Sequence, residues 1–353
     1  MQTIWNGGVD VIVFLQALGE WLAPLMKFLS FLGVPQFYLL FMPALYWCLD
    51  VGLGVRLGAI LMLSSGLNNA LKIAFHGPRP YWFSRAVKSW SSSPSFGLPS
   101  GHAQNSVSFW GLLAASLRGW WAWGAALVLM FLIGLSRMYL GVHFPSDVIV
   151  GWLIGAVLLG AFLRWEAQVA KWFEEHSCGQ QLGIAFLASL VLVVLSVLSI
   201  ASLGSWQMPE AWIDTALASA GEVPEPLIPN DALTAGGALF GLAAGAVWMS
   251  WMGGFRPDGP AVKRLGRYLV GMVGVFALWY GLKVVFPPDV TPLGWALRYL
   301  RYALIGGWIS AGAPALFLRL GLADRGSCPA SGGVRGGQPD VESEGVARAN
   351  HEE

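Results

Sequence analysis

Residues 182–203 read LGIAFLASLVLVVLSVLSIASL, a run of apolar and small residues that contains no charged side chain. An α-helix needs about 20 apolar residues to cross the hydrocarbon core of a bilayer, so this run is typical of a transmembrane helix. In the whole chain of 353 residues, 56% are hydrophobic and only 12% are charged, whereas about 25% are charged in an average soluble domain. The sequence therefore predicts an integral membrane protein with an all-α fold.

Further apolar stretches of similar length lie on both sides of this run and predict a polytopic helix bundle. The expected spans are 36–52, 53–75, 103–119, 120–140, 146–166, 182–203, 232–252, 266–286 and 293–320. Residues 10–33 are also apolar, but they carry Glu20, Pro24 and Lys27. We interpret this segment as an amphipathic helix on the membrane surface, with a tenth span as the alternative.

The chain therefore divides into four parts. Residues 1–35 form an N-terminal amphipathic or interfacial segment, residues 36–166 a membrane core, and residues 167–320 a set of additional transmembrane helices. Residues 321–353 are rich in Gly, Ser and Glu with few large apolar residues, which predicts a disordered tail.

Basic residues predict the orientation of the chain in the membrane. Loops that contain Arg56, Arg118, Lys171 and Arg264 alternate with loops that carry the polar motifs described below, and the 204–231 loop is acidic. The positive-inside rule then places the basic loops and the tail in the cytoplasm and the motifs on the opposite face. Simple loops without organelle signals suggest a bacterial inner membrane. The net charge of +1 predicts no general attraction to nucleic acid.

Three polar motifs border the spans on the outer face. They are KIAFHGPRP at 72–80, PSGH at 99–102, and Ser136-Arg137 followed by His143 and Asp147. Binding of a multiply charged phosphate requires fixed positive charge and N–H donors. Arg79 and Arg137 can donate in a bidentate manner, and Lys72 supplies a compact charge. The motifs therefore predict a phosphate site.

The Pro-Ser-Gly turn adds donors to this predicted site. It precedes a helix that is expected to begin near His102, and the free N–H groups at a helix start bind anions readily. The Ser100 hydroxyl can add a further contact, while Gly101 allows close approach of the backbone.

The two histidines suit different steps of phosphoryl transfer. We expect His143 to be the nucleophile, because a neutral imidazole can attack phosphorus and form a covalent intermediate. Asp147 follows four residues later, in the first turn of a helix that begins at Pro145, and it is expected to orient the His143 ring. His102 remains to protonate the leaving oxygen and later to activate water. The three cations supply the electrostatic stabilisation, so we expect no metal and no other cofactor.

These motifs resemble the type 2 phosphatidic acid phosphatase superfamily. The family pattern is Lys, six residues, Arg-Pro; then Pro-Ser-Gly-His; then Ser-Arg, five residues, His, three residues, Asp, and each position is matched here within residues 36–166. The resemblance implies a six-helix-type phosphatase core and metal-independent hydrolysis of phosphomonoesters or pyrophosphates through a phosphohistidine. It also implies that Ser136 lies near the bound phosphate.

The sequence motifs limit the type of reaction more narrowly than they limit the substrate. We expect the aromatic residues of the connecting loop to line an interfacial mouth through which a lipid enters; they are Tyr81, Trp82, Phe83, Trp90 and Phe96. Arg85 and Lys88 are candidates to hold a second phosphate. Our first hypothesis is a phosphatase that acts on a lipid phosphate or on an isoprenyl pyrophosphate such as undecaprenyl pyrophosphate at the extracytoplasmic face.

Three alternatives stay open. The span layout is similar to that of glucose-6-phosphatases, which favours a sugar phosphate, but Asp147 follows the lipid phosphatase pattern instead. The enzyme could also transfer a phosphoryl or headgroup to an alcohol. A further alternative is that the spans after residue 166 transport a lipid carrier, with Arg298 and Arg301 either as interfacial anchors or as residues of a pathway.

Overall fold

The computed structural model describes residues 2–287 and 291–326, and these residues are almost entirely helical, which confirms the all-α prediction. The elements in chain order are α1 (Gln2–Ala17), η1 (Glu20–Leu22), α2 (Ala23–Phe31), α3 (Pro35–Cys48), α4 (Val51–Phe75), α5 (Pro80–Phe83), α6 (Gly101–Leu117), α7 (Trp120–Tyr139), α8 (Pro145–Glu174), α9 (Cys178–Ser202), α10 (Glu210–Ala220), α11 (Asn230–Trp251), β1 (Phe255–Arg256), α12 (Ala261–Phe276), η2 (Ala277–Gly281), α13 (Leu282–Val285), α14 (Pro292–Gly307), η3 (Trp308–Gly312), α15 (Ala313–Arg319) and β2 (Asp324–Arg325).

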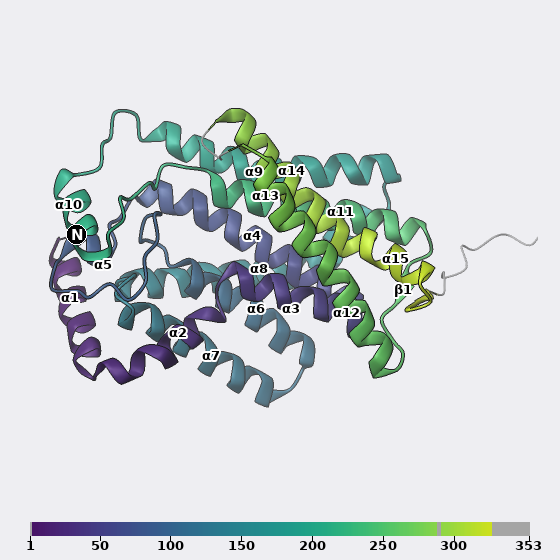
Figure 1. Cartoon of the computed structure of the whole chain (residues 1–353), viewed down its shortest axis with the longest axis horizontal. Coiled ribbons are helices and arrows are strands. Elements are labelled where there is room, and N and C mark those ends of the chain that lie inside the picture. The colour runs from purple at the N-terminus through teal and green to yellow at the C-terminus, as the bar shows by residue number, and fades with distance from the viewer. Residues whose placement is uncertain (1, 288–290, 327–353) are drawn as a thin grey trace, which may run out of the picture.

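Helix α4 lies in the middle of the bundle and is shared by two groups of helices (Figure 1). On one side it packs against α6, which in turn contacts α7 and α8. On the other side it packs against α9 and α11, and α11 packs closely against α14. The first group carries the sequence motifs, so α4 connects the motif-bearing core to the additional helices.

Six helical segments of the described chain are long and apolar enough to cross a membrane, and a seventh is possible if the bent N-terminal pair is counted as one span. They are Val51–Phe83, Trp120–Tyr139, Pro145–Glu174, Cys178–Ser202, Asn230–Trp251 and Ala261–Val285. The sequence predicted nine spans. For two of the missing spans the difference arises because α3 and α6 have only 14 and 17 residues, which is short of the length that hydrocarbon requires. The third, which runs without a break through α14, η3 and α15 from Pro292 to Arg319, is long enough but not apolar enough.

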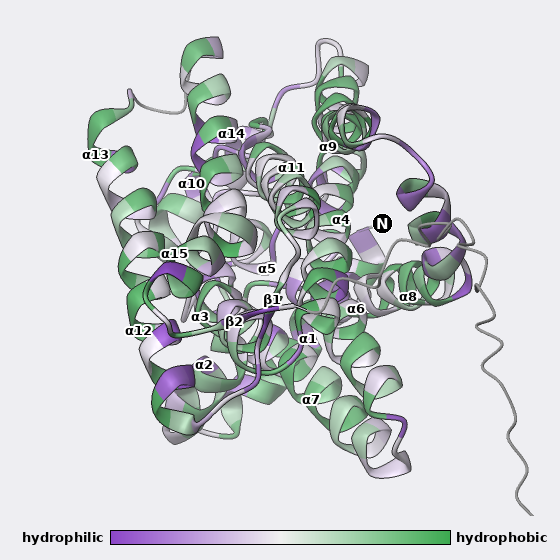
Figure 2. Cartoon of the chain, turned by 90° about the vertical axis from the view of Figure 1, so that its right-hand side faces the viewer, coloured by the Kyte–Doolittle hydropathy of each residue, from purple (hydrophilic) through white to green (hydrophobic). Residues whose placement is uncertain are grey.

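Hydrophobic residues predominate along these helices (Figure 2), and many of their large apolar side chains are exposed, as contact with lipid requires. Large side chains such as Trp120 on α7, Val157 on α8 and Leu187 on α9 are exposed. In water such a surface would be an aggregation hazard, so the exposed apolar faces support the integral membrane assignment.

The N-terminal segment is neither one surface helix nor one straight span. It consists of α1 and then the η1–α2 segment, which meet at an angle of 88°. Gly19 lies at the bend with φ of 118°, a conformation that favours glycine. Helix α2 packs against α7, and Ile12 of α1 is buried with Tyr139 and Phe144. The chain that leaves α2 therefore lies beside the ends of α7 and α6.

The described part of the C-terminal region folds back on the bundle. Strand β2 (Asp324–Arg325) pairs antiparallel with β1 (Phe255–Arg256), and Ala323 is buried. The segment predicted to be disordered from residue 321 is therefore ordered as far as residue 326, because these residues form the second strand of this pair. The rest of that prediction, residues 327–353, lies outside the described residues.

Helices α11 and α14 touch through glycines. A Cβ atom added to Gly237 would lie 2.3 Å from the Tyr299 carbonyl oxygen, and one added to Gly241 would lie 1.9 Å from the Ala303 carbonyl oxygen. Small residues spaced four apart let two membrane helices approach until their backbones meet. The α11–α14 pair is therefore held by contacts between backbones.

Candidate active site

Lys72 lies in the last turn of α4, where the chain reverses. His76 ends the helix in the left-handed region at φ of 37°, and the following loop returns over the end of α4. The Lys72 Nζ donates hydrogen bonds to the carbonyl oxygens of Phe96, at 2.5 Å, and Gly97, at 3.3 Å. These contacts hold a buried ammonium group without supplying a negative charge.

Arg79 is fixed by the same loop. Its Nε donates to the Ser95 carbonyl oxygen at 2.5 Å, and its Nη2 donates to the Ser93 hydroxyl at 2.9 Å. Its Nη1 donates to the Val142 carbonyl oxygen at 2.9 Å. The guanidinium group therefore joins the loop after α4 to the loop between α7 and α8, and its orientation is fixed before any ligand binds.

Arg137, near the end of α7, is the third buried cation. One of its Nη atoms donates to the Ser30 hydroxyl of α2, and its Nε has no partner. In the part of the chain that the structure describes, Lys72, Arg79 and Arg137 form no ion pair within 4.0 Å. Buried charges are costly unless they are compensated, so three neighbouring unpaired cations indicate a site for an anion.

The Pro-Ser-Gly turn is held between α4 and α8. Ser100 caps α6 with its hydroxyl, and its N–H donates to the Asp147 carbonyl oxygen at 2.9 Å. A Cβ on Gly101 would lie 2.8 Å from the Asn68 amide oxygen, and a Cβ on Gly151 would lie 2.6 Å from the Ser100 carbonyl oxygen. Both glycines therefore allow neighbouring helices to press against the turn and fix the start of α6.

His143 lies in the loop between α7 and α8 and is buried beside Asp147. Its Nδ1 is 3.4 Å from the Asp147 Oδ2, and its Nε2 is 3.4 Å from the Arg79 Nη1. The same carboxylate oxygen accepts the Phe144 N–H at 2.9 Å, which caps α8. Burial, with the charges of Arg79 and Lys72, lowers the pKa of His143 well below its ordinary value. The ring is therefore neutral at physiological pH and presents Nε2 on the side of Arg79.

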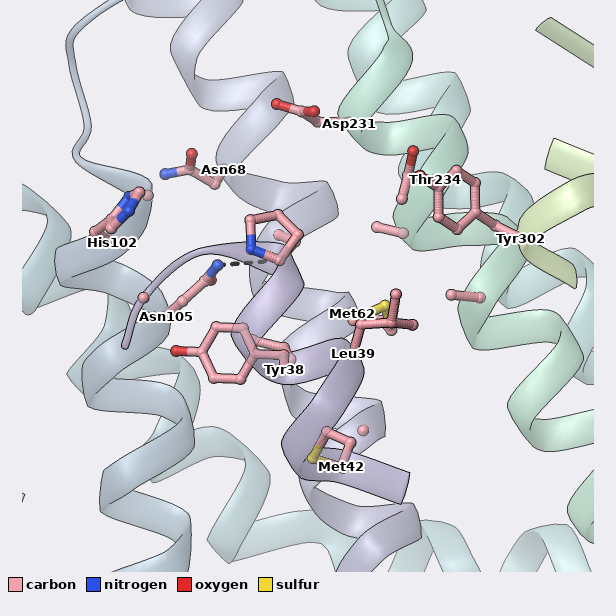
Figure 3. Close-up of a pocket in the computed structure, with 18 of the residues that line it drawn as sticks. Tyr38, Leu39, Met42, Met62, Asn68, His102, Asn105, Asp231, Thr234 and Tyr302 are labelled. Carbon is pink, nitrogen blue, oxygen red and sulfur yellow. Dashed lines mark hydrogen bonds between the residues drawn. The ribbon is translucent and has the colours of Figure 1, made fainter. Parts of the chain in front are cut away.

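His102, in the first turn of α6, faces the same space (Figure 3). Its Nε2 is buried without a hydrogen-bond partner. A Cβ on Gly33 would lie 2.7 Å from the His102 Cδ2, so the backbone after α2 covers the ring. An unpartnered ring nitrogen that faces a cavity is available to a ligand.

These side chains surround a cavity of about 370 Å³. The predicted site residues that line it are Lys72, Arg79, Gly101, His102, Arg137 and His143. The lining does not include Ser100, Ser136 and Asp147. Ser136 donates its hydroxyl to the Ile133 carbonyl oxygen of its own helix at 2.7 Å, so its role near phosphate stays a prediction.

Several residues of the site were not among those predicted from the sequence. Ser93 and Ser95 bind Arg79 and line the cavity, and Gly33 covers His102. The serine-rich stretch at 91–95, shortly before the Pro-Ser-Gly-His motif, could have indicated that polar side chains of this loop belong to the site. Asn68 also lines the cavity and donates to the Gln104 amide oxygen at 2.8 Å.

Two expectations about the mouth of the site are wrong. Tyr81, Trp82 and Phe96 are buried in a hydrophobic core that also includes residues of α1 and α10, so they do not line an entrance for lipid. Lys88 pairs with Glu20 at 2.5 Å, and neither Lys88 nor Arg85 lines the cavity. The N-terminal segment accounts for both errors, because it packs over this loop.

The two arginines of α14 differ in burial: Arg301 is buried and Arg298 is half-buried. Arg298 donates to the Asn230 carbonyl oxygen at 3.1 Å and to the Thr234 hydroxyl at 2.9 Å. Arg301 is buried, and its guanidinium lies 5.2 Å from the centre of the Tyr302 ring. Arg298 thus helps to fix α14 next to α11.

The described residues contain no group of three or more His, Cys, Asp or Glu side chains placed to hold a metal ion. The chemical groups of the site are instead three cations, two imidazoles and one carboxylate. Such a set can bind a phosphate and transfer it to a ring nitrogen.

Comparison with known families agrees with this geometry. Residues 53–171 match the family model described as "PAP2 superfamily", and residues 233–325 match the one described as "PAP2 superfamily phosphatase, transmembrane extension". The two matches together cover more than half of the chain, and the protein belongs to the PAP2 superfamily. It is an integral membrane protein with several spans.

Individual relatives match about half of the chain. Glucose-6-phosphatase 3 of Bos taurus is 26% identical over 183 residues, which are 45% of this chain and 53% of the relative. A probable sphingosine-1-phosphate phosphatase of Dictyostelium discoideum is 30% identical over 204 residues, or 52% of this chain and 49% of the relative. The chain thus spans about half the length of the curated relatives it matches.

Among solved structures, a transmembrane PAP2 type phosphatidylglycerolphosphate phosphatase from Bacillus subtilis is similar with a TM-score of 0.40 and 23% identity. The match covers 46% of this chain and 87% of that protein.

Proposed function

We propose that this protein is a phosphatase that hydrolyses a lipid phosphate or isoprenyl pyrophosphate through a phosphohistidine at His143. The observation that carries the proposal is the group of three buried cations without carboxylate partners around a cavity that also contains His143 and His102. A bound phosphate would compensate these charges, and His143 lies at its edge.

The first step transfers the phosphoryl group to His143. The neutral Nε2 forms a bond to phosphorus while the bond between phosphorus and the substrate oxygen breaks, and His102 gives a proton to that oxygen. Burial and the neighbouring cations lower the pKa of His102, so its proton is held by the charge of the bound phosphate anion. Asp147, 3.4 Å from Nδ1, stabilises the positive charge that develops on the ring. Arg79, Arg137 and Lys72 stabilise the charge on the phosphoryl oxygens.

The second step releases orthophosphate. Neutral His102 takes a proton from a water molecule, the water oxygen attacks phosphorus, and the bond between phosphorus and Nε2 breaks. His143 is then neutral and His102 is protonated, as at the start. The chemistry of both steps is carried by side chains of this chain.

The lipid substrate is supported by the composition of the cavity. Beyond the cations its lining is mostly apolar, including Leu39, Met42, Leu61 and Ile305. The polar side chains of the lining, such as Asn68, Asn105 and Asp231, lie nearer the cations, and the apolar residues farther along the cavity suit a hydrocarbon chain better than the hydroxyl groups of a sugar. The likeness to a probable sphingosine-1-phosphate phosphatase is consistent with a lipid phosphate.

We further propose that the site acts at the extracytoplasmic face, because the basic loops alternate with the motif loops along the chain. In a bacterial cell this would be the periplasmic face of the inner membrane.

The test is phosphate release by the purified full chain in detergent with EDTA present. Undecaprenyl pyrophosphate, phosphatidic acid, sphingosine 1-phosphate and glucose 6-phosphate are compared, with His143→Ala as the variant and His176→Ala as the control. We expect release from a lipid substrate that falls at least about 10³-fold in His143→Ala and is unchanged in His176→Ala, which lies outside the cavity. A radiolabelled substrate should leave an acid-labile phosphoprotein that accumulates in His102→Ala.

Other results would redirect the proposal. Release from glucose 6-phosphate alone would move the function to the sugar-phosphate branch. No release from any of the four substrates would favour transfer to an alcohol or lipid transport. Full activity in His143→Ala would overturn the phosphohistidine mechanism.

A further inference from the structure

The cavity does not end at the phosphate-binding cations but continues along α4. Its lining residues on this helix recur every three or four positions, from Lys72 through Asn68, Ser65, Leu61 and Gly58 to Gly54. At a rise of about 1.5 Å per residue these positions cover about 27 Å of helix. The hydrocarbon core of a bilayer is about 30 Å thick, so one face of α4 borders a groove across most of the membrane.

Three other helices complete the walls of this groove. Helix α3 contributes Tyr38 and Met42, α11 contributes Ala238 and Leu242, and α14 contributes Ile305. Figure 3 shows α3 side chains such as Met42 on the same side of the space as Met62 of α4, with Thr234 of α11 and Tyr302 of α14 opposite. Apart from Asp231 and Thr234 near the upper end, the lining from α11 and α14 is apolar or aromatic.

The cation site at one end and the apolar lining beyond it match the two parts of a lipid phosphate. An apolar cavity of about 150 Å³ holds one benzene ring. A cavity of about 370 Å³ that includes the cation site therefore has room for a phosphate group and on the order of ten carbon atoms. That volume accommodates one hydrocarbon chain, whereas a phospholipid with two long chains would need roughly twice as much space.

We propose that this groove binds the single apolar chain of the substrate, and that α11 and α14 form one of its walls. The proposal gives α11 and α14, which belong to the transmembrane extension, a role in substrate selection. It rests on the proposed function, because the phosphate of the same substrate molecule occupies the cation site. The chemical class is a phosphomonoester or diphosphate on one long hydrocarbon chain.

The groove can be blocked at Ala238, which lines it on α11. Ala238→Phe inserts an aromatic ring between α11 and α4. Ala188→Phe makes the same change on α9 at an exposed position outside the cavity, and it is the matched control. The substrates are hexadecyl phosphate and butyl phosphate, which share the phosphate group and differ in chain length.

We expect Ala238→Phe to lower kcat/KM for hexadecyl phosphate by about tenfold to a hundredfold, the range that overfilling a packed site costs. Butyl phosphate should change by no more than about twofold, because its chain ends before the inserted ring. Ala188→Phe should leave both values unchanged. Ala238→Leu should lie between the wild type and Ala238→Phe, and so it provides a milder variant if the phenylalanine disturbs folding.

Failure of this inference is distinguishable from failure of the proposed function. If the wild type hydrolyses both substrates and Ala238→Phe and Ala238→Leu leave their ratio unchanged, the chain does not occupy the groove, while the phosphatase assignment stands. If the wild type hydrolyses neither substrate, the proposed function fails. Binding then decides the groove: hexadecyl phosphate should raise the midpoint of thermal unfolding in the wild type and not in Ala238→Phe, and equal shifts would overturn it.

Discussion

Asp147 has a structural role at the start of α8 and a proposed role beside His143, and one substitution can separate the two. Its Oδ2 accepts the Phe144 N–H at 2.9 Å and caps α8, and it lies 3.4 Å from the His143 Nδ1. Asp147→Asn retains a carbonyl oxygen for the cap but removes the negative charge beside the imidazole. The variant should therefore fold and still lose the stabilisation of the charged ring that forms in the first chemical step.

The two consequences differ strongly in size. Replacing a charge-assisted hydrogen bond by a neutral one costs about 1 kcal/mol of the free energy of unfolding. The loss of an orienting carboxylate beside a catalytic histidine costs about 10²- to 10⁴-fold in kcat. A large kinetic effect with a small effect on stability is therefore the expected signature of Asp147→Asn.

Asp50→Asn provides the matched control for this experiment. Asp50 also caps the start of a helix, because it is the N-cap residue of α4 and accepts the Leu53 N–H at 2.9 Å, at the end of that helix opposite to Lys72. Phosphate release and the midpoint of thermal unfolding in detergent are measured for both variants. If the two variants lose the same small amount of activity, or if the loss in Asp147→Asn only follows its unfolding, the orienting role of Asp147 is refuted.

Two further predictions concern the histidines. Gly33→Ala places a Cβ 2.7 Å from the His102 Cδ2, so the ring must shift and kcat should fall by about tenfold to a hundredfold. Gly7→Ala is the control, because a Cβ there meets nothing within 4 Å and should change neither kcat nor stability. Equal activity of the two variants would contradict the role of Gly33. Burial and the neighbouring cations lower the pKa of His143, so this ring stays neutral and nucleophilic as the pH falls from about 8 to 6, and protonation removes activity only at lower pH. A pH profile of kcat/KM checks this, and a loss of activity centred near the ordinary histidine pKa of about 6.5 would contradict it.

Several residues that line the cavity could be predicted from the sequence because charged residues at the ends of apolar spans are rare and stand out. Lys72, Arg79, Arg137 and His143 meet around one cavity although 71 positions separate the first from the last. Their spacing within each motif also predicts which helix end carries them. The helical nature of the chain was predictable for the same reason, since apolar runs of about 20 residues have few alternatives.

The surroundings of the site could not be predicted in this way. Ser30 and Gly33 belong to a segment whose bend depends on Gly19 and on packing against α7, and nothing local marks them as neighbours of Arg137 and His102. Tyr81 suits an interface as well as a core, and only the covering N-terminal helices decide between the two. The apolar wall of the groove consists of common residues, which carry no distinguishing pattern.

The glycine contacts between α11 and α14 bear on which hydrocarbon chains the proposed groove would accept. Where side chains separate two helices, a rotamer change can widen or narrow the space beside them. At Gly237 and Gly241 the main chains touch, with 1.9 Å between an added Cβ at Gly241 and the Ala303 carbonyl oxygen, so no side chain can yield there. The wall is therefore rigid, and a hydrocarbon chain has to change its own conformation to fit beside it. Kinked and straight chains of equal length should then differ in their affinity for the groove.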